Sequence, residues 1–372
     1  MKLKAALVSL GSVSSLWTAE AMKKYFHRVD NVNLKSVEVQ LGKSDVQIFQ
    51  EDKPLKDYDC VYIKGSFRYL ALLRSIAQLL PSRTYTPISP EAFNLGHDKL
   101  LTQLALQKSG IPMPKTFIPA TVEAAKKILQ KMNFPIVMKF PQGTQGKGVV
   151  FADSISAAVS VLDALTALNQ PFIIQEYIET GGADIRAFVV GDKVIASMKR
   201  VSSSPDNEKR SNIHAGGKGE PVELDSKTRL IAVKAAQIIG ADICGIDLLM
   251  SPTGPLVIEV NLSPGLQGIT GATKIDVADE MAKYLYKRAY ERKMSLEKHK
   301  KERILTDLGI EEAQVRGVAK EIVGLLDFRA NRILLPEVIT EISRFKDNQD
   351  VQISAEKGKI VIRKYGPSQE EE

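Results

Sequence analysis

Hydrophobic and polar positions in residues 1–96 alternate between the periods of strands and helices. The pattern predicts strands at 4–10, 34–40 and 60–63 and helices at 17–27 and 69–80. A basic start with a short apolar run also occurs in signal peptides, but Gly11 and the helical pattern after it favour a first strand. Strands that alternate with helices indicate a small βα sandwich around a parallel sheet.

A different order of elements begins at residue 97. Asp98 and Thr121 are typical N-caps for the next two helices. The expected elements are helices at 99–108, 122–132 and 155–168 and strands at 136–140, 149–151 and 172–175. They indicate a separate α+β unit.

Antiparallel hairpins dominate the pattern after residue 176. We expect strands at 186–190, 193–199, 244–250 and 256–261 and helices at 226–239 and 277–290. Beyond a charged segment at 291–303, the pattern predicts helices at 311–326 and 336–345 and a hairpin of 351–354 with 359–363. The predicted fold class is therefore α/β and α+β, with parts at 1–96, 97–175, 176–290 and 291–372.

Composition narrows the class of protein. The chain has 372 residues, of which 44% are hydrophobic and 26% charged, so it is long enough for two or three domains of ~150 residues. The net charge of +7 suits anionic small molecules, but it is spread along the chain, so binding of nucleic acid is not expected. Apolar runs are too short for a membrane span. Cys60 and Cys244 lie in apolar strands and are read as buried thiols of a cytoplasmic protein.

A glycine-rich loop follows the apolar strand that contains Lys139. Gly143, Gly146 and Gly148 lie between two strands, whereas Walker and dinucleotide-binding loops must open a helix. Backbone N–H groups of such a loop can close over phosphates, although a plain hairpin turn is the alternative. Lys139 strengthens the phosphate interpretation, because a buried ammonium needs an anion unless the side chain snorkels to solvent.

Three oxygen-bearing side chains are expected to converge on the hairpin of the last two strands before 262. Glu259 and Asn261 are two residues apart and share a face, and Asp247 can face them across the turn. Carboxylate and amide oxygens without His or Cys are typical of a Mg²⁺ site. The alternative is simple alternation on a half-exposed strand.

Several motifs in register resemble the ATP-grasp superfamily, and within it the RimK-type alpha-L-glutamate ligases. They are His97–Lys99, Met138–Lys139, Gln175–Ile178, Gly181–Asp192, Arg210–Gly217, Gly245–Leu249 and Ile258–Gly265. The resemblance covers residues 97 to 289 and implies an ATP-grasp fold with an additional C-terminal α+β domain. It departs from the family at His97, where Arg is usual, and at residues 201–209, which are longer and richer in serine.

The resemblance implies a role for each matching position. Lys99, Lys139 and the glycine loop would hold the ATP phosphates, and Glu176, Tyr177, Ile178 and Asp184 would receive adenine and ribose. Arg210, Ser211 and Asn212 would contact nucleotide or phosphate, and Asp247, Glu259 and Asn261 would bind two Mg²⁺, which Mn²⁺ could replace. Arg186 and Arg210 would be catalytic, with Arg186 facing the reacting carboxylate; for Arg186 the alternative is a structural ion pair with Asp184.

The implied activity is ATP-dependent ligation of a carboxylate to an amine through an acylphosphate. The expected partners are ATP, L-glutamate or a similar amino acid, and an acidic acceptor that is a protein, a peptide or a cofactor. A glutathione-synthase-like or amino-group-carrier ligase is the alternative among enzymes, and an ATP-binding regulatory protein is the alternative outside them. A homo-oligomer is also expected. Lys64 and Arg68 resemble the stretch that faces the substrate from the N-terminal domain, with a solvated helix start as the alternative.

Overall fold

The computed structural model divides into two compact units, Met1–Lys301 and Glu302–Glu372. It describes residues 1–42, 46–140, 148–168, 170–201, 218–307, 327–329, 332–335, 345, 349 and 351–364. Within these residues no helix has the length and apolar character needed to cross a membrane.

The N-terminal region is built on a parallel sheet of three strands. Its order is β2–β1–β6, formed by Arg28–Asn33, Lys4–Ser9 and Cys60–Ile63. Helix α1, Val13–Lys23, begins directly after β1, and the 3₁₀ turn Phe67–Tyr69 leads into α2, Leu70–Leu79. The parallel sheet expected from the sequence is present, with β1 and β6 where the apolar runs predicted them.

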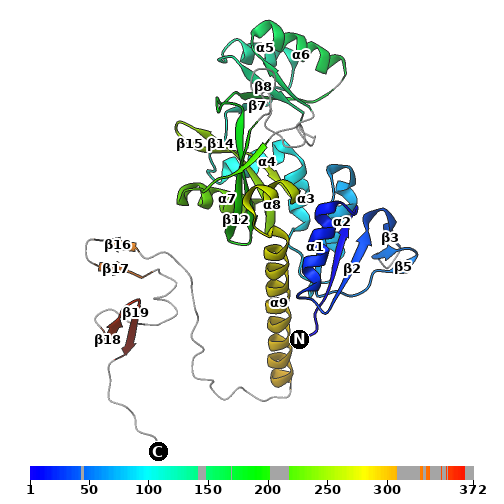
Figure 1. Ribbon diagram of the computed structural model, residues 1–372, viewed down its shortest axis with the longest axis vertical. Helices are drawn as coiled ribbons and strands as arrows, with labels where there is room; N and C mark the ends of the chain where they lie inside the picture. Colours follow the sequence, from blue (N-terminus) through cyan, green and yellow to red (C-terminus); the bar gives the residue numbers. More distant parts are fainter. Residues whose placement is uncertain are drawn as a thin grey trace, which may run out of the picture. The chain divides into compact units, whose positions relative to one another are not determined.

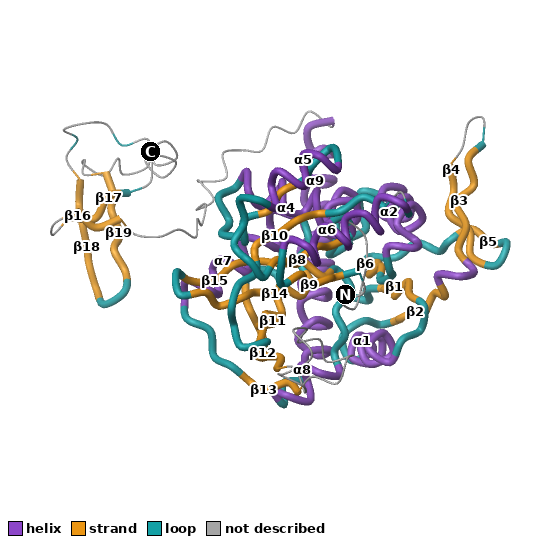
Figure 2. Tube along the Cα trace, turned by 90° about the horizontal axis from the view of Figure 1, so that it is seen from above, coloured by secondary structure: helices purple, strands orange, loops and turns teal. Residues whose placement is uncertain are grey.

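Two predictions for this region were wrong in detail. The strand expected at 34–40 is a 3₁₀ turn, Leu34–Ser36, followed by β3, Val37–Leu41. Strand β3 belongs to a separate antiparallel sheet with β4, Val46–Gln50, and β5, Lys53–Pro54, which lies at the periphery in Figure 2. Besides β6, strand β1 pairs with the polar strand β2, which was missed because an edge strand needs few apolar residues. Helix α1 also begins earlier than expected, because Ser12 caps it.

Residues 90–176 form two helices and a small α+β unit. Helices α3, Pro90–His97, and α4, Lys99–Lys108, adjoin at Asp98, which caps α4 as predicted. Helix α3 was not expected from the sequence, although Ser89 is its N-cap and Pro90 its first residue. An antiparallel sheet follows, in the order β7–β10–β8–β9, from Thr116–Phe117, Ile173–Glu176, Ile136–Lys139 and Val149–Ala152. Helices α5, Val122–Leu129, and α6, Ile155–Ala167, pack on it around their own apolar core (Figure 1).

The largest sheet is antiparallel and carries most of the predicted site. Its order is β13–β12–β11–β14–β15, from Lys218–Pro221, Lys193–Val201, Ala183–Val190, Ile243–Ser251 and Gly254–Asn261. Helix α7, Ser226–Ile239, packs against it, and α8, Gln267–Thr273, and α9, Val277–Asp307, follow it in the chain. The expected boundary after residue 290 lies inside α9.

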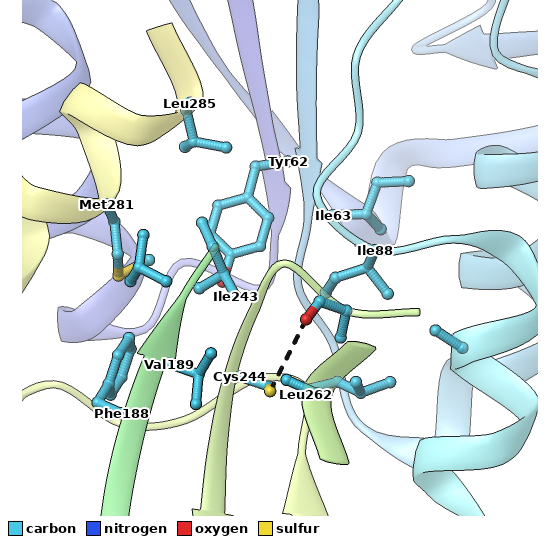
Figure 3. Close-up of a cluster of buried hydrophobic side chains, with 14 of the residues drawn as sticks. Tyr62, Ile63, Ile88, Phe188, Val189, Ile243, Cys244, Leu262, Met281 and Leu285 are labelled. Carbon is cyan, nitrogen blue, oxygen red and sulfur yellow. Dashed lines mark hydrogen bonds between the residues drawn. The ribbon is translucent and has the colours of Figure 1, made fainter. Parts of the chain in front are cut away.

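One apolar core joins the N-terminal sheet to the largest sheet. Tyr62 of β6, Phe188 of β11, Ile243 of β14 and Leu285 of α9 are buried together in it (Figure 3). Cys60 and Cys244 belong to the same core as free thiols, as predicted, and burial raises the pKa of each. This packing fixes the ends of β6, β14 and β15 relative to one another.

The second unit contains two described hairpins. Strands β16, Asp327–Arg329, and β17, Arg332–Leu334, form one, and β18, Val351–Glu356, and β19, Lys359–Lys364, form the other. The second hairpin confirms the prediction. The helices expected at 311–326 and 336–345 fall almost wholly outside the described residues.

Candidate functional site

A cavity of about 640 Å³ opens where the elements of the first unit converge, within the usual range for a small-molecule site. Its wall combines the ends of β1 and β6, the start of α4, strands β8–β10, and the sheet of β11, β14 and β15. Of the predicted nucleotide, metal and catalytic residues that the structure describes, all but Gly148 line it: Lys99, Lys139, Glu176, Tyr177, Ile178, Asp184, Arg186, Asp247, Glu259 and Asn261.

One part of the wall is an apolar slot next to the end of β10. Val137, Phe151 and Ile178 face the cavity there, and the Phe151 ring meets the Tyr177 ring edge-on at 5.9 Å between centroids. Glu176 is fixed at the edge of the slot, because its Oε1 accepts the Lys115 N–H at 2.7 Å. Apolar side chains beside a carboxylate suit a purine base.

Lys139 lies at the end of β8 with one polar partner among the described residues. Its Nζ donates to Gln175 Oε1 at 2.6 Å, and Gln175 Nε2 donates to Thr116 Oγ1 at 2.8 Å. Burial lowers the pKa of Lys139 to about 8; the field of Glu259 opposes this shift, and that of Lys99 adds to it. An anion beside Lys99 and Lys139 would relieve both the burial and the repulsion of like charges.

A chain of buried ion pairs crosses the floor of the cavity. Arg186 donates from Nε and Nη2 to Asp247 at 2.8 and 2.7 Å, and Arg200 donates to Asp184 at 2.6 and 2.7 Å. Arg200 Nη2 also lies 2.9 Å from Asp247 Oδ2, which links the two pairs. The alternative for Arg186, a structural ion pair, is present, but the partner is Asp247, whereas Arg200 binds Asp184. Among the described residues, none forms a hydrogen bond with Arg186 Nη1, which can still donate to a ligand.

Two β-bulges create this arrangement. Counting back from the turn pair Val190 and Lys193 would set Lys199 opposite Asp184, but a bulge between Phe188 and Val189 brings Arg200 there instead. A second bulge, between Asp247 and Leu248, sets Glu259 rather than Ile258 opposite Asp247. Each bulge moves a charged side chain onto the cavity face, since a shift of one residue reverses the face of a strand.

The Asp247–Glu259–Asn261 cluster fits a hard cation. Burial and the Asp247 carboxylate together raise the pKa of Glu259, and no described residue forms a hydrogen bond or ion pair with its side chain. Burial alone would raise the pKa of Asp247, but Arg186 and Arg200 outweigh it and hold that pKa well below its usual value. Two carboxylates and an amide oxygen are donors that Mg²⁺ prefers, and a cation would offset the repulsion between the carboxylates. Asn261 Oδ1 meanwhile accepts the Ser263 N–H at 3.0 Å, which fixes its orientation.

Some predicted residues cannot be placed. Gly143, Gly146, Arg210, Ser211 and Asn212 lie outside the described residues. Gly148 is described, with φ +79°, and a Cβ there would lie 2.2 Å from the Phe140 ring. Glycine is thus required where the loop rejoins β9.

Sequence reasoning missed Arg200 and the start of α1. Arg200 precedes a polar segment and gave no motif signal, and only the bulged register reveals its partners. Ser12, Ser14 and Ser15 also line the cavity, and the signal that could have shown it is the N-cap serine after a buried strand. Of the two cations proposed near the substrate, Lys64 lines the cavity, whereas Arg68 is exposed and does not.

Comparison with known proteins gives consistent likenesses. Residues 96–285 match the family described as RimK-like ATP-grasp domain. The chain is 37% identical over 277 residues to a "Probable alpha-L-glutamate ligase" of Marinomonas sp., covering 73% of this chain and 90% of that one. It is 38% identical over 276 residues to a protein of the same name from Vibrio cholerae, with the same coverage. Among solved structures, the ATP-grasp ligase PsnB, complexed with minimal precursor, Mg and ADP, gives a TM-score of 0.60 at 19% identity, covering 77% of this chain and 98% of that one.

Proposed function

Because the chain belongs to the RimK-like ATP-grasp family and is an ATP-dependent ligase that forms amide bonds, we propose that it joins L-glutamate to a carboxylate of an acidic acceptor. The acceptor is a protein, a peptide or a cofactor. The structural likeness confirms the fold class expected from the sequence. The names of the relatives favour catalysis over a purely regulatory ATP-binding role.

The observation that carries the proposal is the composition of the cavity of about 640 Å³. An apolar slot, two lysines, a bidentate Arg186–Asp247 pair and the oxygen donors of Glu259 and Asn261 all face it. This set matches the successive parts of a Mg²⁺–nucleotide complex: base, phosphates and cation.

In the proposed mechanism, the chain positions and neutralises its substrates and supplies no nucleophile. Lys99 and Lys139 hold the phosphates, with Gly143, Gly146, Gly148, Arg210, Ser211 and Asn212 as further phosphate or nucleotide contacts. Asp247, Glu259 and Asn261 would hold two Mg²⁺, which when bound would supply positive charge to offset that of the phosphates. Arg186, oriented by Asp247, directs Nη1 toward the carboxylate that takes the γ-phosphoryl group. Attack by the amine of glutamate on the resulting acylphosphate then forms the amide and releases phosphate.

The test is ADP release from ATP in the presence of Mg²⁺, glutamate and a panel of acidic acceptors. We expect release to require both substrates, and the mass of the product to show an added glutamyl unit. Release with a different amino acid and none with glutamate would refute the glutamate assignment while leaving the ligase chemistry intact.

A further inference from the structure

Lys64 and the first turn of α1 meet at one edge of the N-terminal parallel sheet. Lys64 follows β6 directly, and its N–H continues the strand pairing by donating to Val8 O at 2.8 Å. Helix α1 begins just after β1, the central strand of the sheet. The carboxyl ends of parallel strands are where ligands bind in such sheets.

The Lys64 side chain is buried without a hydrogen-bond acceptor. It is 4% exposed, its Nζ has no hydrogen-bond partner among the residues that the structure describes, and it lines the cavity. Its Nζ lies 5.6 Å from the centroid of the Tyr62 ring, and Tyr62 is itself buried in the apolar core (Figure 3). Burial lowers the pKa of Lys64 to about 8, so the ammonium form still predominates at neutral pH. A buried cation in this state lacks an anion.

The start of α1 provides hydrogen-bond donors for the same anion. Ser12 Oγ accepts the Ser15 N–H, and the helical geometry leaves the N–H groups of Val13 and Ser14 without an acceptor inside the helix. The first turn contains no acidic residue, so its partial positive charge is not offset locally. Ser12, Ser14 and Ser15 all line the cavity.

The loop after β15 connects this region to the predicted metal ligands. Gly65 N–H donates to Ser263 Oγ at 3.1 Å, and Leu266 N–H donates to Ser14 Oγ at 2.9 Å. Ser263 N–H in turn donates to Asn261 Oδ1. The loop thus fixes Lys64 and α1 beside the cluster where the reaction would occur.

We propose that Lys64 and the first turn of α1 form a subsite for a substrate carboxylate that is not phosphorylated in the reaction. The inference rests on the proposed function, because both glutamate and an acidic acceptor carry such a spare carboxylate. Lys64 acts as the charged anchor, and the α1 amides set the orientation of the carboxylate plane. Because Lys99 and Lys139 belong to a different part of the wall, the nucleotide does not need Lys64.

The experiment is calorimetric titration of the full chain with Mg²⁺ and ADP present. L-Glutamate serves as the probe for the amino acid, and N-acetyl-L-glutamate as the probe for a blocked acidic acceptor. We expect Lys64→Met and Lys64→Gln to weaken binding of at least one probe by tenfold or more, and Lys64→Arg to weaken it less. The probe affected tells which substrate supplies the carboxylate. Arg74→Met, at an exposed position of α2 outside the cavity lining, is the control and should bind like the wild type.

Three results would overturn the subsite. The first is unchanged affinity of the Lys64 variants for both probes. The second is that neither probe binds to the wild type. The third is that the variants lose as much affinity for ADP as for the probes, which would make Lys64 a phosphate ligand. Melting temperatures of the two neutral variants show whether either has lost the fold. A chain that binds a probe through Lys64 but never releases ADP with glutamate would refute the proposed function and leave the subsite standing.

Discussion

At the scale of single residues, Arg200 links the two buried ion pairs at the floor of the cavity. It is 5% exposed and pairs with two buried carboxylates, those of Asp184 and Asp247. Loss of one partner from such a buried ion pair is costly, because the other charge is left buried and unpaired.

Replacing Arg200 by Ala should therefore destabilise the protein by about 3 kcal/mol, because Asp184 loses its bidentate partner and Asp247 one of two. Arg200→Lys should lose less, since it keeps the charge but not the forked geometry. Thermal unfolding measures both. Arg83→Ala, which removes an exposed pair with Asp57, should change the melting temperature little. Equal melting temperatures for Arg200→Ala and Arg83→Ala would contradict the structural role.

Replacing Glu259, unlike replacing Arg200, should leave stability unchanged or raise it and should lower activity. Its pKa is raised, so the charged form is disfavoured in the fold and costs stability at every pH above its unfolded pKa. Glu259→Gln removes that cost, and we expect an equal or higher melting temperature near pH 7.

Glu259→Gln should also lower Mg²⁺-dependent turnover by ~100-fold or more, because the metal ion loses a negatively charged ligand. It should also remove the rise in melting temperature that Mg²⁺ and ADP give the wild type. The exposed Glu223→Gln is the control. Full activity in Glu259→Gln would exclude this residue as a metal ligand.

At the scale of elements, local signals predicted much of the secondary structure and none of its irregularities. Capping residues and apolar periods located α4, α7 and the hairpins within a few residues. The bulges at Phe188/Val189 and Asp247/Leu248 were not predictable, because they depend on how a whole strand packs and leave no mark in local sequence. Alternation along β15 was therefore enough to predict that Glu259 and Asn261 share a face. It was not enough to fix the register that sets Asp247 opposite Glu259.

The cap of α4 gives a test at this scale. Asp98 Oδ1 accepts the N–H groups of Leu100 and Leu101 at 2.8 and 3.1 Å, at the helix start that carries Lys99. Asp98→Ala should lower the free energy of unfolding by about 1 kcal/mol, whereas Asp98→Asn, which still caps, should change it by only a few tenths. Denaturant unfolding compares them. If Asn and Ala were equally destabilising, the charge rather than the cap would be responsible.

At the scale of the whole molecule, the described site lies in the first unit. All residues that line the cavity, among those the structure describes, lie between Leu10 and Gln267, and the family match ends at residue 285. The sequence indicated a boundary after residue 290, where the composition becomes charged, but α9 continues through it to Asp307. Composition could not reveal this, because a solvated helix and a linker are both rich in Lys and Glu.

Two side chains near the middle of α9 bind to the N-terminal region. Arg292 Nε donates to Ser82 O at 2.8 Å, and Lys293 Nζ lies 2.8 Å from Asp59 Oδ1. A chain ending at Asp307 keeps these contacts, whereas one ending at Tyr290 loses them.

We therefore expect the chain that ends at Asp307 to bind Mg²⁺–ADP with the affinity of the full protein and to keep the melting temperature of the first unit. The chain that ends at Tyr290 should melt several degrees lower, because it loses a bond to a carbonyl group and a half-buried ion pair, worth about 1 kcal/mol each. Calorimetric titration with ADP and thermal unfolding of the three chains provide the comparison. If the chain that ends at Asp307 bound ADP more weakly than the full protein, residues 308–372 would take part in nucleotide binding. If both shortened chains had the same melting temperature, Arg292 and Lys293 would contribute nothing to the stability of the fold.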